Sequence, residues 1–529
     1  MPDPVVKLAS RLNSPKWQTG IFFLLLVAWI TPIYFPSLYH IPRSDHIVYL
    51  ANTSQVEGPA LVTQFYSYDR TPHLYNLYYD AVLFRPLFLA FLGLEKWVWG
   101  DNFMLWQITG ILLHLAFVWN LLRLLLTLQR SIFAFYFMLF YASLFVGSEM
   151  VIWQHVNAYM IYLNLVLIAL RKLYLMTTAK RLSRNDLIIL LACLFPMSFL
   201  YEAGFLVSIA CFIYVTWISR KPTEGSARSY LWLLLVPPAL YISTYVWDLH
   251  IHHLGASVIP TAIPGINLTS AIEHFLLAIY WWLFAGLFPL HLIIIAIQRP
   301  EFIVPPPAMF LEQLSSSGIF IKLLAYNAVA LMAAVCLMVM NRVNRAFIRT
   351  RRPFVCLVGG LLFLHVALIV MGRLNGRDFL GILAHTAYYA SFFWVFLIAL
   401  VYSLIDFNYF TQKHRIFTLN LIICCLAITV ISSRLVLHLN DLIRNNSRQQ
   451  RSVLCDIRQH IQANKTRQPF TFAVYPKGPQ DIPWIHRSDG TPGHNNYFEL
   501  LYLKNYDEAN PTCTYELCKT DFVRRCRSQ

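Results

Sequence analysis

Charged residues are scarce in this chain of 529 residues. Asp, Glu, Lys and Arg together make up 13% of it, whereas an ordinary globular chain carries about 25%. Apolar residues make up 57%. This composition leaves too little polar surface to cover a soluble fold, and it also excludes a disordered chain, a collagen and a small disulfide-rich scaffold. The sequence therefore predicts an integral membrane protein.

Acidic residues are scarcer than basic ones. The chain has 42 Lys and Arg against 26 Asp and Glu, a formal net charge of +16. In a soluble protein this excess would favour nucleic-acid binding, but in a membrane protein cations first indicate which side of the bilayer a loop occupies. The aromatic residues suit the membrane interface and lipid-facing packing rather than a platform for stacking bases. We therefore expect a lipid bilayer as partner and no nucleic acid.

Apolar runs of about 20 residues, the length that crosses a bilayer as a helix, recur along the chain. The first run has no small-residue cleavage pattern, so we interpret it as a span rather than a cleaved signal peptide. Three cations precede it, which predicts a cytoplasmic N-terminus. The predicted spans lie at 20–36, 105–128, 131–148, 156–176, 187–200, 204–219, 230–247, 323–340, 354–371, 386–405 and 416–433.

The cations support this orientation when the spans alternate. The predicted cytoplasmic segments hold 20 Lys and Arg and the short outer loops hold eight, as the positive-inside rule requires. Residues 271–298 are apolar but are broken by Gly286 and Pro289. A single span there would place the five arginines of 341–353 outside. Two short spans would avoid this and give 13 spans in all, whereas a re-entrant element would avoid it and leave 11. The C-terminus lies outside in either case.

The predicted fold is an all-α polytopic membrane protein with 11–13 transmembrane helices and a small extracytoplasmic C-terminal α/β domain. The membrane domain covers 1–434 and includes a first outer loop at 37–104, in which 83–99 is amphipathic enough to form short interfacial helices. The tail, 435–529, contains clusters of Pro, Gly, Asp and Asn. Its four cysteines favour up to two disulfides of undetermined pairing over free thiols or a metal site. They are Cys455, Cys513, Cys518 and Cys526.

Isolated acids at predicted outer turns are the first candidates for chemistry, because charge near a bilayer is costly. Asp45, which is followed by His46, lies beyond the first span and could deprotonate an acceptor hydroxyl or hold a divalent cation. Glu202 is the only charged residue between Asp186 and Arg220. It should pair with a cation or a metal, or have a raised pKa. The alternative for each acid is a solvated or helix-capping role.

A second outer turn carries another acid and a histidine. Glu149 and His155 flank this turn, and together with Asn157 they could line the same cavity. A structural role at a helix end is the alternative for His155.

Arginines at the predicted outer boundary suit a phosphate or diphosphate lipid headgroup, because the guanidinium fork binds two oxygens at once. Arg85 lies in the first outer loop, and Arg373 and Arg377 follow the span 354–371. The alternative for each is an interfacial arginine that snorkels. Three residues at the start of the next predicted helix join the same candidate site: His385, Tyr388 and Tyr389.

The local sequence around these residues resembles the polyprenyl-phosphate-sugar-dependent members of the GT-C superfamily of polytopic glycosyltransferases. The resemblance covers about residues 20–220 and includes a short acid motif, Tyr201-Glu202-Ala203. It also includes an "RPL … FG … H … N" run, which here consists of Phe84-Arg85-Pro86-Leu87, Trp99-Gly100-Asp101-Asn102, His114 and Asn120. The chain departs from the family pattern where His46, rather than a second acid, follows Asp45.

The resemblance implies an inverting transfer of a sugar from a polyprenyl-phosphate donor to a glycan or protein acceptor on the outer face. Asp45 would be the catalytic base or a metal ligand, and Arg85 would support the loop or the lipid headgroup. Asp45 and Glu202 are therefore the predicted catalytic residues. No cofactor is certain, although Asp45 could hold a divalent cation such as Mg²⁺ or Mn²⁺.

Two other functions compete with this prediction. One is an O-antigen polymerase or ligase, whose large outer loop normally lies between late spans. The other is a lipid-linked sugar transporter or flippase, which would need charges deep within helices and two similar halves; the chain shows neither. We expect a bacterial inner membrane with a periplasmic C-terminus, or the endoplasmic reticulum membrane if the source is eukaryotic.

Overall fold

The computed structural model of the chain describes residues 15–40, 58–60, 85–100, 102–179, 183–219, 226–251, 345–373, 389–409 and 415–463, together with single residues between 272 and 286. Within this part, 93% of the residues are helical and no strand occurs. Six of the described helices are long and apolar enough to cross a membrane. The chain is therefore a multi-pass membrane protein, and its described part is all-α.

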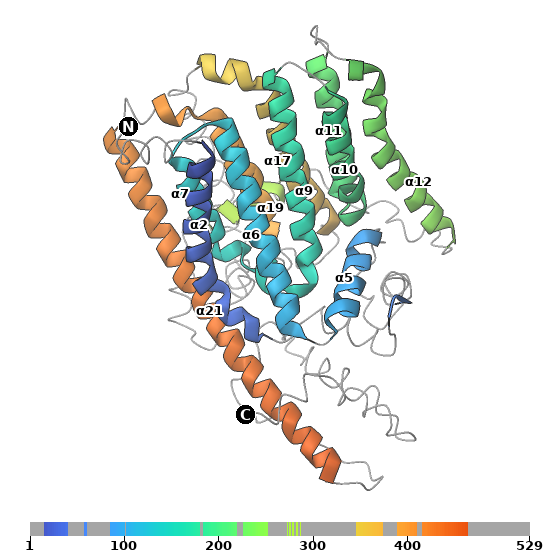
Figure 1. Cartoon of the computed structure of the whole chain (residues 1–529), viewed down its shortest axis with the longest axis vertical. Helices are drawn as coiled ribbons and strands as arrows, with labels where there is room; N and C mark the ends of the chain where they lie inside the picture. Colours follow the sequence, from blue (N-terminus) through green and yellow to red (C-terminus); the bar gives the residue numbers. More distant parts are fainter. Residues whose placement is uncertain are drawn as a thin grey trace, which may run out of the picture.

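The described helices pack side by side as a bundle (Figure 1). The long and medium helices are α2 (Pro15–Tyr34), α5 (Pro86–Trp99), α6 (Phe103–Leu128), α7 (Phe133–Ala142), α9 (Asn157–Ala179), α10 (Arg184–Leu200), α11 (Ala203–Ser219), α12 (Val236–Ile251), α17 (Arg345–Arg373), α19 (Tyr389–Leu404) and α21 (Arg415–Ala463). The shorter pieces are η1 (Phe35–Tyr39), η3 (Phe145–Gly147), α8 (Glu149–Ile152), η4 (Gln154–Val156) and η5 (Ser226–Leu235).

Apart from 131–148, each predicted span that falls on described residues is helical in the structure. The span 323–340 lies outside the described residues, as does most of 271–298, so the total of 11–13 spans stays a prediction. The stretch 131–148 differs from its prediction, because α7 ends at Ala142 and is followed by η3. Ser391 of α19 packs here: its Oγ lies 2.7 Å from the ideal Cβ position of Gly147 and donates to the Gly147 carbonyl at 3.2 Å.

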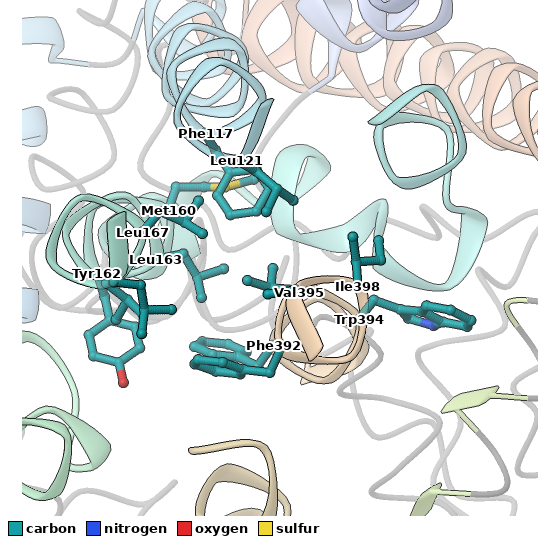
Figure 2. Packing of buried hydrophobic residues seen from close by; sticks show 14 of the residues in the cluster. Phe117, Leu121, Met160, Tyr162, Leu163, Leu167, Phe392, Trp394, Val395 and Ile398 are labelled. Atoms are coloured by element: carbon teal, nitrogen blue, oxygen red, sulfur yellow. The ribbon is translucent and has the colours of Figure 1, made fainter. Parts of the chain in front are cut away.

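The core lies where α6, α9 and α19 meet (Figure 2). Phe117 and Leu121 of α6 lie beside Met160 and Leu163 of α9, with Val395 of α19 completing the group. All five side chains are buried. Large apolar side chains such as those of Leu24, Leu112 and Phe363 are instead exposed on the outside of the bundle. A lipid environment stabilises an apolar exterior of this kind, whereas water does not.

Polar side chains connect α2 to α21. The indole Nε1 of Trp29 donates to Ser143 Oγ at 2.9 Å and to Ser433 Oγ at 3.2 Å. The amide nitrogen of Asn440 donates to the Ile33 carbonyl at 2.8 Å. Within a bilayer these groups have no water to bond instead, so the bonds hold the two helices in one register.

Helix α21 continues beyond the domain boundary predicted at residue 434 and ends at Ala463. It extends past the rest of the bundle in Figure 1. No Pro or Gly occurs between Arg415 and Ala463, so nothing in this sequence breaks the helix where its apolar part ends. Residues 464–529, including Cys513, Cys518 and Cys526, lie outside the described residues. The predicted α/β domain and its disulfides stay predictions.

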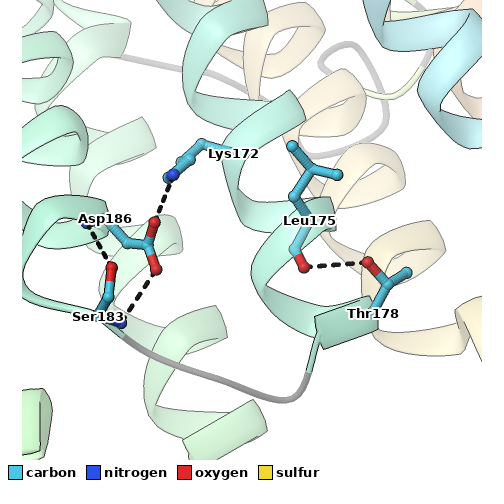
Figure 3. Close-up of polar contacts among 5 residues, drawn as sticks. All are labelled: Lys172, Leu175, Thr178, Ser183 and Asp186. Carbon is cyan, nitrogen blue, oxygen red and sulfur yellow. Dashed lines mark hydrogen bonds and ion pairs between the residues drawn. The ribbon is translucent and has the colours of Figure 1, made fainter. Parts of the chain in front are cut away.

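The connection between α9 and α10 is held by a capping box (Figure 3). The Asp186 backbone N–H donates to Ser183 Oγ at 3.2 Å, and the Ser183 N–H donates to Asp186 Oδ2 at 3.0 Å. Lys172 of α9 forms an ion pair with the same carboxylate. Burial alone would raise the pKa of Asp186, but the bonds from Lys172 and Ser183 outweigh it and hold the pKa below its usual value.

Candidate functional site

Arg85 and Glu202, 117 residues apart in the sequence, form an ion pair at one end of the bundle. Arg85 Nε donates to Glu202 Oε1 at 2.5 Å. The Arg85 side chain is 14% exposed and that of Glu202 is 24% exposed. The isolated acid therefore has a cationic partner, which is one of the outcomes its position in the sequence predicts.

Local sequence places Arg85 at the start of α5. The residue before a proline is pushed out of the helical region, and Arg85 accordingly has φ −130° and ψ 57°. Pro86 then occupies the first helical position, where its missing N–H costs nothing. Arg85 is thus the N-cap residue of α5, and its side chain is directed to neighbouring helices rather than along α5.

A tight turn between α10 and α11 places Glu202. Tyr201 ends α10 with an extended backbone, φ −154° and ψ 140°. The Gly204 N–H donates to the Tyr201 carbonyl at 2.7 Å. A Cβ at Gly204 would lie 1.9 Å from the Met197 carbonyl oxygen, so only glycine fits where α11 leaves α10. The turn holds Glu202 at the end of the bundle, facing Arg85.

Two tyrosines enclose the guanidinium of Arg85. Arg85 Nη1 donates to the hydroxyl of Tyr159. The Arg85 Cζ atom lies 5.6 Å from the ring centre of Tyr159 and 5.2 Å from that of Tyr201, within cation–π range. Burial works to lower the pKa of Arg85, but the charge of Glu202 and the tyrosine hydroxyls, including that of Tyr389, outweigh it and keep this pKa well above its ordinary value. The guanidinium therefore stays charged.

Within the described part of the chain, one nitrogen of Arg85 and one oxygen of Glu202 take no part in the ion pair or in other hydrogen bonds. The Nε and Nη1 atoms of Arg85 are bonded within the protein, and Glu202 uses Oε1. Among the described residues, neither Arg85 Nη2 nor Glu202 Oε2 has a hydrogen-bond partner. Both side chains remain partly accessible. The guanidinium can therefore offer a donor to an anion, and the carboxylate that contacts it can offer an acceptor to a hydroxyl.

A second polar group lies between α5, α6 and the start of α9. Asn157 Nδ2 donates to Glu95 Oε1 at 2.7 Å, and Gln107 Nε2 donates to the Val151 carbonyl at 2.7 Å. Glu95 is 3% exposed, and Asn157 and Gln107 are fully buried. Burial raises the pKa of Glu95 well above its usual value, and the bond from Asn157 offsets this only in part.

Glu149 and His155 lie close to this second group in the chain. Glu149 is the first residue of α8, and His155 lies in η4, directly before α9. Each is 7% exposed, and the imidazole of His155 lies 5.4 Å from the Trp153 ring centre. Both are therefore largely buried in the segment that leads to Asn157.

Several predicted site residues cannot be placed in this group. Asp45, His46, Arg377, His385 and Tyr388 lie outside the described residues. Arg373 is the last residue of α17, and its side chain is not described. Tyr389 begins α19 and is close enough to Arg85 to influence its pKa.

A metal site has no support from the described residues. Among them, no three His, Cys, Asp or Glu side chains come together as potential ligands. The divalent cation considered for Asp45 stays a hypothesis about a residue that lies outside the described part.

Sequence reasoning singled out Arg85 and Glu202 but not their mutual contact, and it missed Tyr159, Glu95 and Gln107 as neighbours of the site. Glu95 precedes Lys96 in an amphipathic stretch, a pattern that usually indicates solvated charges. The apolar residues that flank Glu95 and Lys96 on both sides are the signal that could have indicated the burial of Glu95.

Comparison of the chain with protein-family models, with curated proteins and with solved structures finds no match. The resemblance to GT-C glycosyltransferases therefore depends on the residues quoted for it. The structure itself identifies the chain as a multi-pass membrane protein that is all-α over its described residues.

Proposed function

We propose that this protein is a membrane glycosyltransferase that transfers a sugar from a polyprenyl-phosphate donor to a hydroxyl of a glycan or protein acceptor, on the non-cytoplasmic face of the membrane. The observation that carries the proposal is the Arg85–Glu202 ion pair, which brings a cation and a carboxylate into direct contact at one end of the bundle. The two motifs that resemble the family supply these two residues.

The proposed reaction needs one cation and one base. The acceptor oxygen forms a bond to the anomeric carbon of the sugar, and the bond from that carbon to the phosphate oxygen breaks with inversion. The electron pair leaves with the polyprenyl phosphate, whose growing charge Arg85 stabilises. The proton of the acceptor hydroxyl passes to a carboxylate.

Two carboxylates could accept that proton. Glu202 Oε2 is adjacent to the arginine that would bind the phosphate, which suits a base that acts at the same bond. The other carboxylate is that of Asp45, to which the family resemblance gives the role of base. We therefore assign proton transfer to Asp45 or Glu202 and assign the orientation of Arg85 to Glu202 in either case.

The enclosure of Arg85 has a chemical purpose in this proposal. A free arginine would lose about 2 kcal/mol of side-chain entropy on binding a phosphate. Here Tyr159, Tyr201 and Glu202 have already fixed the guanidinium plane. A preorganised donor stabilises charge that develops in the transition state without any further rearrangement.

Mass analysis of surface glycans in a strain that lacks the gene tests this function. We expect a missing or altered sugar, restored by the wild-type gene and not by the Glu202→Gln variant. The control is Asp441→Asn, which breaks another Arg–carboxylate pair, between Asp441 Oδ1 and Arg444 Nη2 at 2.8 Å on α21, and should restore the glycan. Unchanged glycans in the deletion strain would count against the proposal and favour a transporter or a scaffold.

A further inference from the structure

Helix α5 contacts the first turn of α9 at both of its ends. Arg85, at the start of α5, bonds the hydroxyl of Tyr159, and Glu95, in its last turns, bonds Asn157. Ten residues of helix span about 15 Å, whereas the two residues from Asn157 to Tyr159 span about 3 Å. One end of α9 therefore holds both ends of α5, and a displacement of the Glu95 contact would also move Arg85.

The Glu95 contact is closely fitted. Gly110 of α6 faces Asn157: a Cβ at Gly110 would lie 2.8 Å from Asn157 Oδ1 and 3.3 Å from the Val151 carbonyl oxygen. The absence of a side chain at Gly110 lets α6 approach the start of α9 this closely. Asn157 Nδ2 is also 3.4 Å from the Trp106 carbonyl oxygen. Asn157 thus connects α5, α6 and α9 at a single point.

Glu95 fits this position as an uncharged acid. Its Oε1 accepts from Asn157, and its Oε2 is buried without a hydrogen-bond partner among the described residues. No described cation forms an ion pair with it. An ionised carboxylate with a single bond from a neutral amide would be very costly at 3% exposure, whereas a protonated carboxyl tolerates the same surroundings.

We propose that Glu95, as the uncharged acid, and Asn157 are positioning residues that hold Arg85 against Tyr159 and Glu202. The inference rests on the proposed function only in that a polyprenyl phosphate serves as the ligand of Arg85. Glu95→Gln keeps the neutral shape and an oxygen for Asn157, so it should keep Arg85 in place. Glu95→Ala and Asn157→Ala remove the contact, so they should release that end of α5.

Binding of a polyprenyl phosphate to the full chain in phosphatidylcholine nanodiscs tests the proposal. We expect Arg85→Met to weaken binding at least tenfold. Glu95→Ala and Asn157→Ala should weaken it about five- to tenfold, a coupling of ~1 to 1.4 kcal/mol, and Glu95→Gln should bind within about twofold of wild type. The matched control is Asn164→Ala on the same helix. It removes the bond that Asn164 donates to the Leu113 carbonyl and the bond that it accepts from Asn120, but it should leave the affinity unchanged.

A double-mutant cycle separates positioning from a general loss of stability. In an Arg85→Met background, Glu95→Ala should weaken binding no further, because it acts through Arg85. A further fivefold loss there, or wild-type affinity in the Glu95→Ala single variant, would overturn the positioning role. If the wild-type protein does not bind the probe, or if Arg85→Met binds as well as wild type, the proposed function fails instead.

Discussion

Arg85 Nε and Glu202 Oε1 lie 2.5 Å apart, and this contact joins the start of α5 to the turn between α10 and α11. Each residue is held by a local feature: Pro86 sets the backbone of Arg85, and Gly204 permits the turn that carries Glu202. The pair therefore links two structural elements and also presents two polar atoms. Its effects on folding and on chemistry can be separated by substitution.

Removal of one partner should destabilise the protein more than removal of both. Arg85→Met leaves Glu202 largely buried without its cation, and we expect a loss of about 1–3 kcal/mol in the free energy of unfolding. The double variant Arg85→Met, Glu202→Gln should recover part of that loss. Thermal unfolding in detergent measures both. Equal stability of the two variants would mean that the charges do not interact in the folded protein.

Lysine should not replace arginine at position 85. A lysine ammonium is a compact charge, and it lacks the planar fork with which Arg85 bonds Glu202 and Tyr159 at the same time. We expect Arg85→Lys to retain most of the stability but to lose at least tenfold in the rate of sugar transfer. Wild-type rates in Arg85→Lys would show that only the positive charge matters.

Gly204→Ala should disrupt the α10–α11 turn, since the new Cβ would lie 1.9 Å from the Met197 carbonyl oxygen. We expect a loss of more than about 3 kcal/mol, or a failure to accumulate in the membrane. Gly360→Ala on α17 is the control, because nothing lies within 4 Å of its Cβ position. It should be neutral or stabilising by about 0.5–1 kcal/mol. Similar behaviour of the two variants would argue against the tight turn.

The Asp186 contact predicts a pH-dependent contribution to stability. Its folded-state pKa is lowered, so its stabilisation is fully present above the unfolded pKa of about 4 and is lost as the pH falls through the folded value. Wild type should therefore unfold at a higher temperature than Asp186→Asn at pH 7. This difference in unfolding temperature should disappear below about pH 4. If the difference in unfolding temperature stayed the same in acid, the capping geometry rather than the charge of Asp186 would account for it.

The helices could be predicted from the sequence because membrane helices are indicated by local apolar runs. The end of α21 could not, because hydropathy marks where a span ends, whereas the helix continues until a breaker or cap stops it. Arg85 and Glu202 could be singled out as charges isolated in apolar surroundings. Their pairing depends on packing between segments 117 residues apart, and no single sequence carries a signal for that contact.

The tyrosines illustrate the same limit. Tyr159 is one of 29 tyrosines, and nothing in its local sequence distinguishes it from those that face lipid. It becomes part of the site because α9 begins at Asn157 and α5 lies against that first turn. Neighbours of this kind follow from tertiary packing, whereas a charged residue within an apolar stretch can be recognised from the amino-acid sequence itself.

The most direct test of the central claim is the release of polyprenyl phosphate from a polyprenyl-phosphate sugar by the purified protein in liposomes, with a panel of hexose donors and a hydroxyl acceptor. We predict transfer from at least one donor, reduced about 100-fold or more in Glu202→Gln and in Arg85→Met and unchanged in Asp441→Asn. Transfer at the wild-type rate by both site variants would contradict the assignment of the chemistry to the Arg85–Glu202 pair.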